Sequence, residues 1–172
     1  MNKGLVHIYT GSGKGKTTAA IGLAVRAVGS GMSVVFFQFL KGMNTAETTP
    51  LEKLDISVHK PAQPKNFVWS MDEKTQKISR DINRKAFLEA CEAMQKYNLV
   101  VLDEIFACLH AGYITLDELL TCIQGKPPET ELVLTGRNAP HEAVALADYV
   151  TEMDAKKHPF EKGVQARKGI EF

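Results

Sequence analysis

The residues with the clearest chemical potential lie in a glycine- and lysine-rich run, HIYTGSGKGKTTAA, over residues 7–20. A P-loop requires a glycine, four residues and then Gly-Lys-Ser/Thr. Residues 15–17 supply the end of this pattern, but Thr10 stands where the first glycine is expected. The remaining glycines still leave the turn conformationally free. We therefore predict a phosphate-binding loop, in which backbone N–H groups and the positive end of a helix hold the anion.

Three side chains of this run have expected roles. Lys16 places a positive charge on the terminal phosphates, and the hydroxyl of Thr17 is positioned to bind Mg²⁺. Lys14 either points to solvent or adds charge to a site that must hold a whole polyphosphate, and the sequence leaves both readings open. A glycine-rich turn of this kind also occurs where a helix only packs closely against a sheet.

A second candidate constellation is LVVLDE at residues 99–104, four apolar residues that end in two carboxylates. We expect a buried parallel strand beside the P-loop strand, with Asp103 and Glu104 at its carboxyl end as metal ligands, as in a Walker B element. The alternative is that one of these carboxylates only caps the following helix.

Neither constellation specifies the reaction. A P-loop ATPase or kinase needs a positioned water or acceptor hydroxyl, usually with an arginine finger or a catalytic base. The sequence indicates no clear residue for these tasks. Arg137, in LTGRNAP, is a candidate phosphate contact or an exposed loop arginine.

The elements that must position these residues alternate between strand and helix patterns. Strands are expected at residues 5–9, 34–39, 56–59, 99–102, 131–135 and 149–153. Helices are expected from 16 to the glycines at 29–31, over 73–97 and 103–113, from 115 onward and over 141–147, with loops at 41–50 and 60–70. This alternation predicts one three-layer α/β domain over residues 1–172, P-loop NTPase-like, with a mostly parallel central sheet.

Composition excludes several protein classes. The 172 residues include 21 basic and 20 acidic side chains, so no electrostatic footprint for nucleic acid is expected. The apolar runs are too short to span a bilayer, and the N-terminus lacks the apolar core of a signal peptide, which predicts a cytoplasmic protein. Three cysteines without CxxC spacing are expected to be reduced and buried.

Several motifs together resemble a known family. They are TGSGKGKTTAA at 10–20, RAVG at 26–29, QFLKG at 38–42, FVW at 67–69, VVLDE at 100–104, LTGR at 134–137 and the tail around 157–163 and 169–170. With these motifs the chain resembles the ATP:corrinoid adenosyltransferases of the cobalamin pathway, the CobA/CobO/BtuR type, over essentially its whole length.

The resemblance implies transfer of the adenosyl group of ATP to the cobalt of a reduced corrinoid, cob(I)alamin or a precursor, with release of triphosphate. ATP then lies in the loop with reversed polarity, and no acceptor for the γ-phosphate is needed. Lys14 and Lys16 surround the leaving triphosphate, and Thr17, Glu104 and Asp103 are the expected Mg²⁺ ligands. The expected nucleotide-binding residues are Gly11, Ser12, Gly13, Lys14, Gly15, Lys16, Thr17, Thr18 and Arg137.

The same resemblance implies a corrin contact and protein partners. Phe67 and Trp69 match aromatics that pack under the corrin and displace its lower axial ligand, whereas from the residues alone they could be loop anchors in the core. An electron donor such as flavodoxin and a homodimer are implied. The competing hypotheses are a P-loop ATPase or small-molecule kinase, and a non-catalytic, nucleotide-gated corrinoid carrier.

Two departures from the family pattern bear on the site. Ser12 stands where a well-known form of the family has asparagine, so its reach toward a nucleotide is shorter. Several members carry an N-terminal extension that covers a neighbouring subunit's site, while this sequence begins shortly before Gly11. A cover over this site is therefore expected to come from elsewhere, or the free site stays more open.

Overall fold

A six-stranded parallel sheet forms the centre of the computed structural model, which describes residues 3–42, 45–62, 64 and 71–171. The strands are β1 (Val6–Thr10), β2 (Val34–Gln38), β3 (Ser57–His59), β4 (Leu99–Asp103), β5 (Glu131–Thr135) and β6 (Tyr149–Glu152). Their order is β3-β2-β4-β5-β1-β6, and every neighbouring pair in this sheet is parallel. The predicted α/β fold with a mostly parallel sheet is confirmed.

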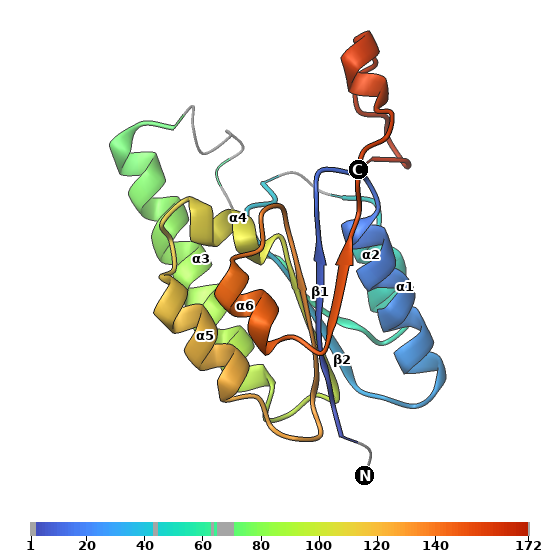
Figure 1. Cartoon of the computed structure of the whole chain (residues 1–172), viewed down its shortest axis with the longest axis vertical. Coiled ribbons are helices and arrows are strands. Elements are labelled where there is room, and N and C mark those ends of the chain that lie inside the picture. Colours follow the sequence, from blue (N-terminus) through green and yellow to red (C-terminus); the bar gives the residue numbers. More distant parts are fainter. Residues whose placement is uncertain (1–2, 43–44, 63, 65–70, 172) are drawn as a thin grey trace.

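Helices cover both faces of this sheet (Figure 1). One face carries α1 (Lys16–Gly29) and α2 (Thr48–Lys53). The other carries α3 (Glu73–Ala93), α4 (Ile105–His110), α5 (Leu116–Gln124) and α6 (His141–Leu146), and a short 3₁₀ turn, η2 (Pro159–Lys162), follows β6. These are the three layers that the alternating sequence pattern predicts.

The sheet separates two apolar cores because neighbouring residues of a strand point to opposite faces. In β4, Leu99 and Val101 pack in the core beneath α1, whereas Val100 and Leu102 pack in the core beneath α3, α5 and α6. Both faces of the central strands are buried, which explains their uninterrupted apolar sequences. In α1 the buried apolar residues are alanines, which let this helix lie close to the sheet.

Three local expectations differ from the structure. First, β4 does not lie beside β1, because β5 is inserted between them. Second, α2 begins inside the expected loop at 41–50, since Pro50 stands in the first turn, where proline costs no intrahelical hydrogen bond. Third, α3 ends at Ala93 and not at 97, and the following turn uses the tighter bond from Lys96 N–H to the Ala93 carbonyl.

The three cysteines belong to the core beneath α3, α5 and α6 or pack against it. Cys108 and Cys122 are buried and Cys91 is half-buried, and all three are free thiols. No helix in the described ranges combines the length and apolar character needed to cross a bilayer.

Candidate functional site

The P-loop connects β1 to α1 and packs against the backbone that follows β6. The N–H of Gly13 donates to the Met153 carbonyl at 2.6 Å, and Met153 N–H donates to the Thr10 carbonyl at 2.9 Å. A Cβ atom on Gly11 would lie 2.5 Å from the Met153 carbonyl oxygen, and one on Gly13 would lie 2.8 Å from it. Both glycines are therefore required by close backbone approach, and Gly11 also by its φ of 102°.

Thr10 explains how the loop tolerates its unusual first residue. It is the last residue of β1, and its backbone pairs with Glu152 of β6, so it does not adopt the left-handed backbone that favours glycine. Its hydroxyl accepts the N–H of Ala139 at 3.2 Å. Thr10 thus connects the loop to the segment after β5, and the missing glycine reflects a strand residue with a contact of its own.

The side chain of Lys16 folds back and contacts the backbone of the P-loop. Its Nζ donates to the carbonyls of Gly11 and Gly13 at 2.8 and 2.7 Å. Burial lowers the pKa of this ammonium, and Arg137 adds to the lowering, while the nearby charges of Glu104 and Asp103 oppose it. The lysine is therefore held at the floor of the site, where an anion would strengthen its charged form.

Asp103 is the most buried charged group of the site, with a fully buried side chain. Its Oδ1 accepts hydrogen bonds from Thr17 at 2.9 Å and Thr135 at 2.7 Å, and its Oδ2 lies 2.7 Å from Lys41 Nζ. Thr17 lies in the first turn of α1, a helix that packs on β5 and β4 as well as on β1, so its hydroxyl reaches a residue two strands away from the P-loop strand. Asp103 therefore orients the Thr17 hydroxyl, whose oxygen lone pairs stay available to a ligand.

Glu104 follows β4 in a strained backbone conformation, with φ 63° and ψ 27°. A non-glycine residue in such a conformation costs about 1–3 kcal/mol, and such strain concentrates at functional sites. Burial raises the pKa of its carboxyl, and the neighbouring Asp103 charge raises it further. Its side chain makes no capping hydrogen bond to α4, so the capping alternative does not describe Glu104.

Lys41 is a site residue to which the sequence reasoning gave no role. It follows Leu40, which has φ 55° and whose N–H donates to Asn83 Oδ1 of α3 at 3.1 Å. Burial lowers the pKa of Lys41, but its contacts with Asp103 and Glu47 outweigh burial and raise the pKa overall. The signal was available, because residues 39–42 follow β2, the strand that neighbours β4.

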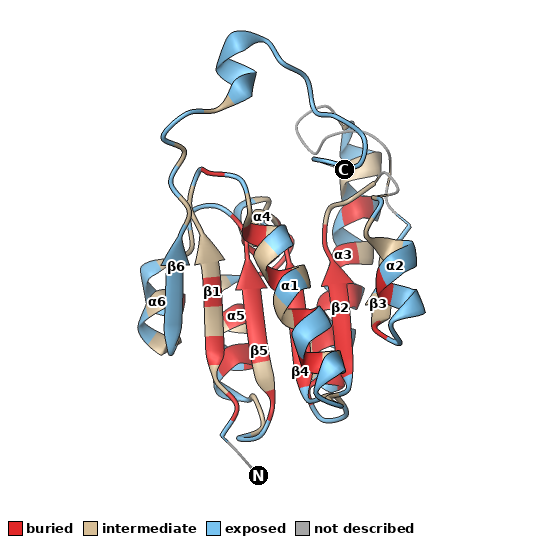
Figure 2. Cartoon of the chain, turned by 90° about the vertical axis from the view of Figure 1, so that its right-hand side faces the viewer, coloured by how far each residue is buried: buried red, intermediate tan, exposed pale blue. Residues whose placement is uncertain are grey.

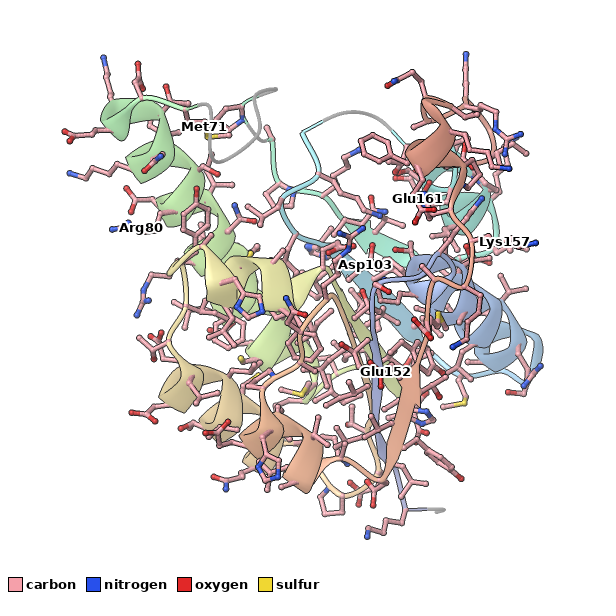
Figure 3. The ribbon with its side chains drawn as sticks, turned by 45° about the horizontal axis from the view of Figure 1, so that its top comes forward. Met71, Arg80, Asp103, Glu152, Lys157 and Glu161 are labelled. Atoms are coloured by element: carbon pink, nitrogen blue, oxygen red, sulfur yellow. The ribbon has the colours of Figure 1, made fainter. Side chains whose placement is uncertain are left out.

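A cavity of about 590 Å³ lies at the carboxyl ends of the strands, where these groups meet. Figure 3 labels Asp103 at this end of the sheet, with Lys157 and Glu161 on the segment that follows β6. The predicted residues that line the cavity are Ser12, Gly13, Lys14, Gly15, Lys16, Thr17, Thr18, Glu104 and Arg137. Gly11 and Asp103 lie behind this lining with the contacts described above, and Phe67 and Trp69 fall outside the described residues.

The wall opposite the P-loop comes from the end of the chain. His158, Gly169, Ile170 and Glu171 line the same cavity. Lys14 points toward this wall, and its Nζ donates to Glu171 Oε1 at 3.1 Å. Lys14 is thus half-exposed and paired with Glu171 in this structure, and its contact with a polyphosphate stays a prediction.

The donors at the floor of the cavity suit a hard cation. The Thr17 hydroxyl and the Glu104 carboxylate are oxygen donors on adjoining elements, and phosphate oxygens and water complete such sites for Mg²⁺. Within residues 3–42, 45–62, 64 and 71–171, no group of three or more His, Cys, Asp or Glu side chains is placed to hold a metal.

The sequence matches one family model and several named proteins. The family, described as ATP:corrinoid adenosyltransferase BtuR/CobO/CobP, matches residues 2–172. The chain is 35% identical over 171 residues to a corrinoid adenosyltransferase of Pseudomonas aeruginosa, covering 99% of this chain and 84% of that protein. A corrinoid adenosyltransferase of Sinorhizobium sp. is 37% identical over 175 residues, which cover 99% of this chain and 81% of that protein. Corrinoid adenosyltransferase CobA of Salmonella typhimurium is 34% identical over 181 residues, which cover 99% of this chain and 86% of that protein.

Among solved structures, the flagellar accessory protein FlaH from Methanocaldococcus jannaschii has a similar fold. The TM-score is 0.54 at 14% sequence identity, over 88% of this chain and 72% of that chain. At this identity the likeness concerns the fold alone.

The family match thus covers the P-loop, the Asp103–Glu104 pair and the C-terminal wall of the cavity. The P. aeruginosa, Sinorhizobium and S. typhimurium proteins align along nearly the whole chain at 34–37% identity. The chain belongs to the BtuR/CobO/CobP family of ATP:corrinoid adenosyltransferases.

Proposed function

We propose that this chain transfers the 5'-deoxyadenosyl group of ATP to the cobalt of a reduced corrinoid, cob(I)alamin or a biosynthetic precursor. The electron pair of Co(I) forms the Co–C bond at ribose C5', the C5'–O bond breaks, and its electrons leave on inorganic triphosphate. Cobalt is formally oxidised from Co(I) to Co(III). The nucleophile belongs to the substrate, so the chain needs no general base at the reacting carbon.

One observation carries the proposal. In a member of this family, the P-loop, Glu104 and Arg137 converge on a single cavity of about 590 Å³. This volume lies in the range of small-molecule sites, and the cationic lining suits a polyphosphate. A leaving group with this much charge must be neutralised as the C5'–O bond breaks, and donors already fixed in place do this most effectively.

We assign a role to each lining residue, and the positions of these residues support the assignment. Lys16 and the loop N–H groups bind the triphosphate from below, and Arg137 binds it from the segment after β5. Lys14 adds charge at the rim. Thr17 and Glu104 hold Mg²⁺, with Asp103 orienting Thr17. When bound, the cation supplies charge neutralisation to the phosphate oxygens.

Further parts of the proposal rest on the family resemblance. Phe67 and Trp69 contact the corrin and favour removal of its lower axial ligand, which makes reduction from Co(II) to Co(I) easier. A flavoprotein such as flavodoxin supplies the electron. The resemblance implies a homodimer, while length and composition support a single domain in each subunit and a cytoplasmic location.

The direct test is an anaerobic incubation of the protein with MgATP and chemically reduced cob(I)alamin. We expect the visible spectrum of a light-sensitive Co–C bond to appear together with one equivalent of triphosphate. Release of ADP without alkylated cobalt would instead indicate a phosphoryl-transfer enzyme. Tight binding of both substrates without turnover would indicate a carrier, and either result would contradict the proposal.

The corrin assignment has a test of its own. Replacing Phe67 or Trp69 by alanine should abolish adenosylation that starts from Co(II), while ATP binding survives. An equal loss of ATP binding would contradict this assignment.

A further inference from the structure

The segment after β6, residues 154–171, returns over the site that the P-loop forms. Figure 2 shows it leaving β6 and passing above the carboxyl ends of the strands. Within the segment Ala155 and His158 are half-buried and the other residues are exposed, and His158, Gly169, Ile170 and Glu171 line the nucleotide cavity. A largely exposed segment that forms a wall of the cavity needs contacts that hold it there.

The segment is attached to the P-loop near both of its ends. Just before its start, Gly13 N–H donates to the Met153 carbonyl at 2.6 Å, and within it Ala155 N–H donates to Ser12 Oγ at 3.3 Å. At its end, Lys14 Nζ donates to Glu171 Oε1 at 3.1 Å. Ser12 and Lys14 therefore bind the segment itself, and Gly13 binds the residue that precedes it.

Glu171 is itself held by Arg167, one helical turn earlier. The Arg167 N–H donates to Glu171 Oε2 at 2.8 Å, and its Nη2 donates to Oε1 at 3.1 Å. These hydrogen bonds, with a smaller contribution from Lys14, lower the pKa of the Glu171 carboxyl to about 2. The carboxylate is thus charged throughout the pH range of ordinary enzymes and fixed in orientation toward Lys14.

The attached segment leaves the site open to a ligand. With Glu171 on Lys14, a cavity of about 590 Å³ still lies between the segment and Lys16, Thr17 and Glu104 on the opposite side. Glu171 therefore occupies the rim of the cavity and not its floor. A segment that adds a wall without filling the cavity acts as a cover.

We propose that residues 154–171 form the cover of the nucleotide site and that the Glu171–Lys14 pair latches it. The proposal rests on the proposed function in taking ATP as the ligand. His158, Gly169 and Ile170 are then nucleotide-site residues contributed by the cover. Glu171 is a positioning residue that acts through Lys14, which holds the cover at the rim and adds its charge to the site there.

The test uses the full chain with Glu171→Gln, which removes the charge, and Glu171→Asp, which keeps it. Glu161→Gln is the matched control, because Glu161 lies in the same exposed segment and is not among the residues that line the cavity. Tryptic cleavage after Lys157 reports opening of the segment without nucleotide. The dissociation rate of a fluorescent N-methylanthraniloyl-ATP in the presence of Mg²⁺ reports closure over the ligand.

We expect Glu171→Gln to raise both rates about two- to five-fold, in keeping with the modest contribution of an exposed ion pair. Glu171→Asp should recover part of the difference, and Glu161→Gln should match the unmodified chain. Unchanged rates in Glu171→Gln would overturn the latch. Slower nucleotide dissociation would also overturn it, because Glu171 would then compete with phosphate for Lys14.

The two proposals fail separately in this design. If the unmodified chain binds no nucleotide, the proposed function is wrong, and the cleavage rates alone decide whether Glu171 holds the segment. If nucleotide binds and both rates are unaffected by Glu171→Gln, the proposed function stands and the cover proposal falls.

Discussion

Two lysine–carboxylate pairs lie at opposite sides of the same cavity, and they differ in burial. Lys41 lies 2.7 Å from Asp103, whose side chain is fully buried, and its own side chain is 20% exposed. Lys14 lies 3.1 Å from Glu171, with side chains 49% and 27% exposed. Solvent screens the exposed Lys14–Glu171 pair effectively and the buried Lys41–Asp103 pair much less. The Lys41–Asp103 pair is thus a fixed part of the cavity floor, whereas the Lys14–Glu171 pair is a reversible contact at its rim.

This comparison predicts that the floor pair tolerates the loss of one partner poorly. Lys41→Met leaves Asp103 buried without its counter-charge, which should lower the free energy of unfolding by about 3–5 kcal/mol. Urea denaturation of the substrate-free protein measures this loss. Lys53→Met, which removes an exposed lysine at the end of α2, should change stability by less than about 0.5 kcal/mol.

A double variant sharpens this first prediction. Adding Asp103→Asn to Lys41→Met removes the uncompensated charge, so part of the lost stability should return. If the double variant is less stable than Lys41→Met by the full cost of Asp103→Asn alone, the two groups are independent and the floor pair is not a unit.

The two lysines of the P-loop should differ in the same way in catalysis. Lys16 contacts the loop carbonyls at the floor, so Lys16→Met removes a fixed donor to the leaving triphosphate and should lower kcat/KM for MgATP about 10²- to 10³-fold. Lys14→Met removes only the rim contact and should lower kcat/KM about two- to five-fold. Anaerobic adenosylation of cob(I)alamin measures both. Equal losses would mean that Lys14 also binds phosphate in the transition state.

The floor was more predictable from the sequence than the rim. Gly-Lys-Thr at 15–17 and the carboxylates after residues 99–102 are local signals, because strand, loop and helix each leave a pattern within a few residues. The insertion of β5 between β1 and β4 could not be read this way, since strand order depends on pairing between distant segments. The contact of Glu171 with Lys14, 157 residues apart, left no local pattern at all.

Lys41 occupies a middle position in this respect. Its position after β2 predicts that Lys41 lies at the carboxyl end of the sheet. That its partner is Asp103 could not be predicted, because the contact requires β2 to lie beside β4. The φ of Leu40, held by Asn83 of α3, directs the chain there, and leucine gives no sequence signal for that conformation. Site residues that depend on tertiary contacts are therefore the ones missed.

Glu104 allows a test, with a smaller expected effect, of whether a charged group at the floor of the cavity lowers the stability of the protein. Burial, followed by the charge of Asp103, raises the pKa of Glu104 above its ordinary value of 4.5. A raised folded-state pKa means that the proton is bound more tightly in the native state, so stability is lost as pH rises through that pKa. Glu104→Gln should therefore make the protein more stable at neutral pH, and the gain should vanish below about pH 4.5, as urea denaturation at both pH values can show.

Activity supplies the other half of this test. The same Glu104→Gln variant should adenosylate more slowly at limiting Mg²⁺, because a neutral amide is a weaker ligand for a hard cation than a carboxylate. A variant that is both less stable at neutral pH and fully active would contradict the assigned role of Glu104.

The smallest expected effect is that of salt, which should weaken the exposed Lys14–Glu171 pair more than the buried Lys41–Asp103 pair. At an ionic strength of about 1 M the Debye length falls to about 3 Å, which screens the exposed Lys14–Glu171 pair far more than the buried Asp103. Tryptic cleavage after Lys157 should then rise toward the rate of Glu171→Gln at low salt, after correction with a short peptide substrate for the effect of salt on trypsin. Glu171→Gln itself should show little further rise, because its latch is already lost. An equal rise in both proteins would mean that salt loosens the segment through other contacts, and the rim pair would then not be what distinguishes it from the floor.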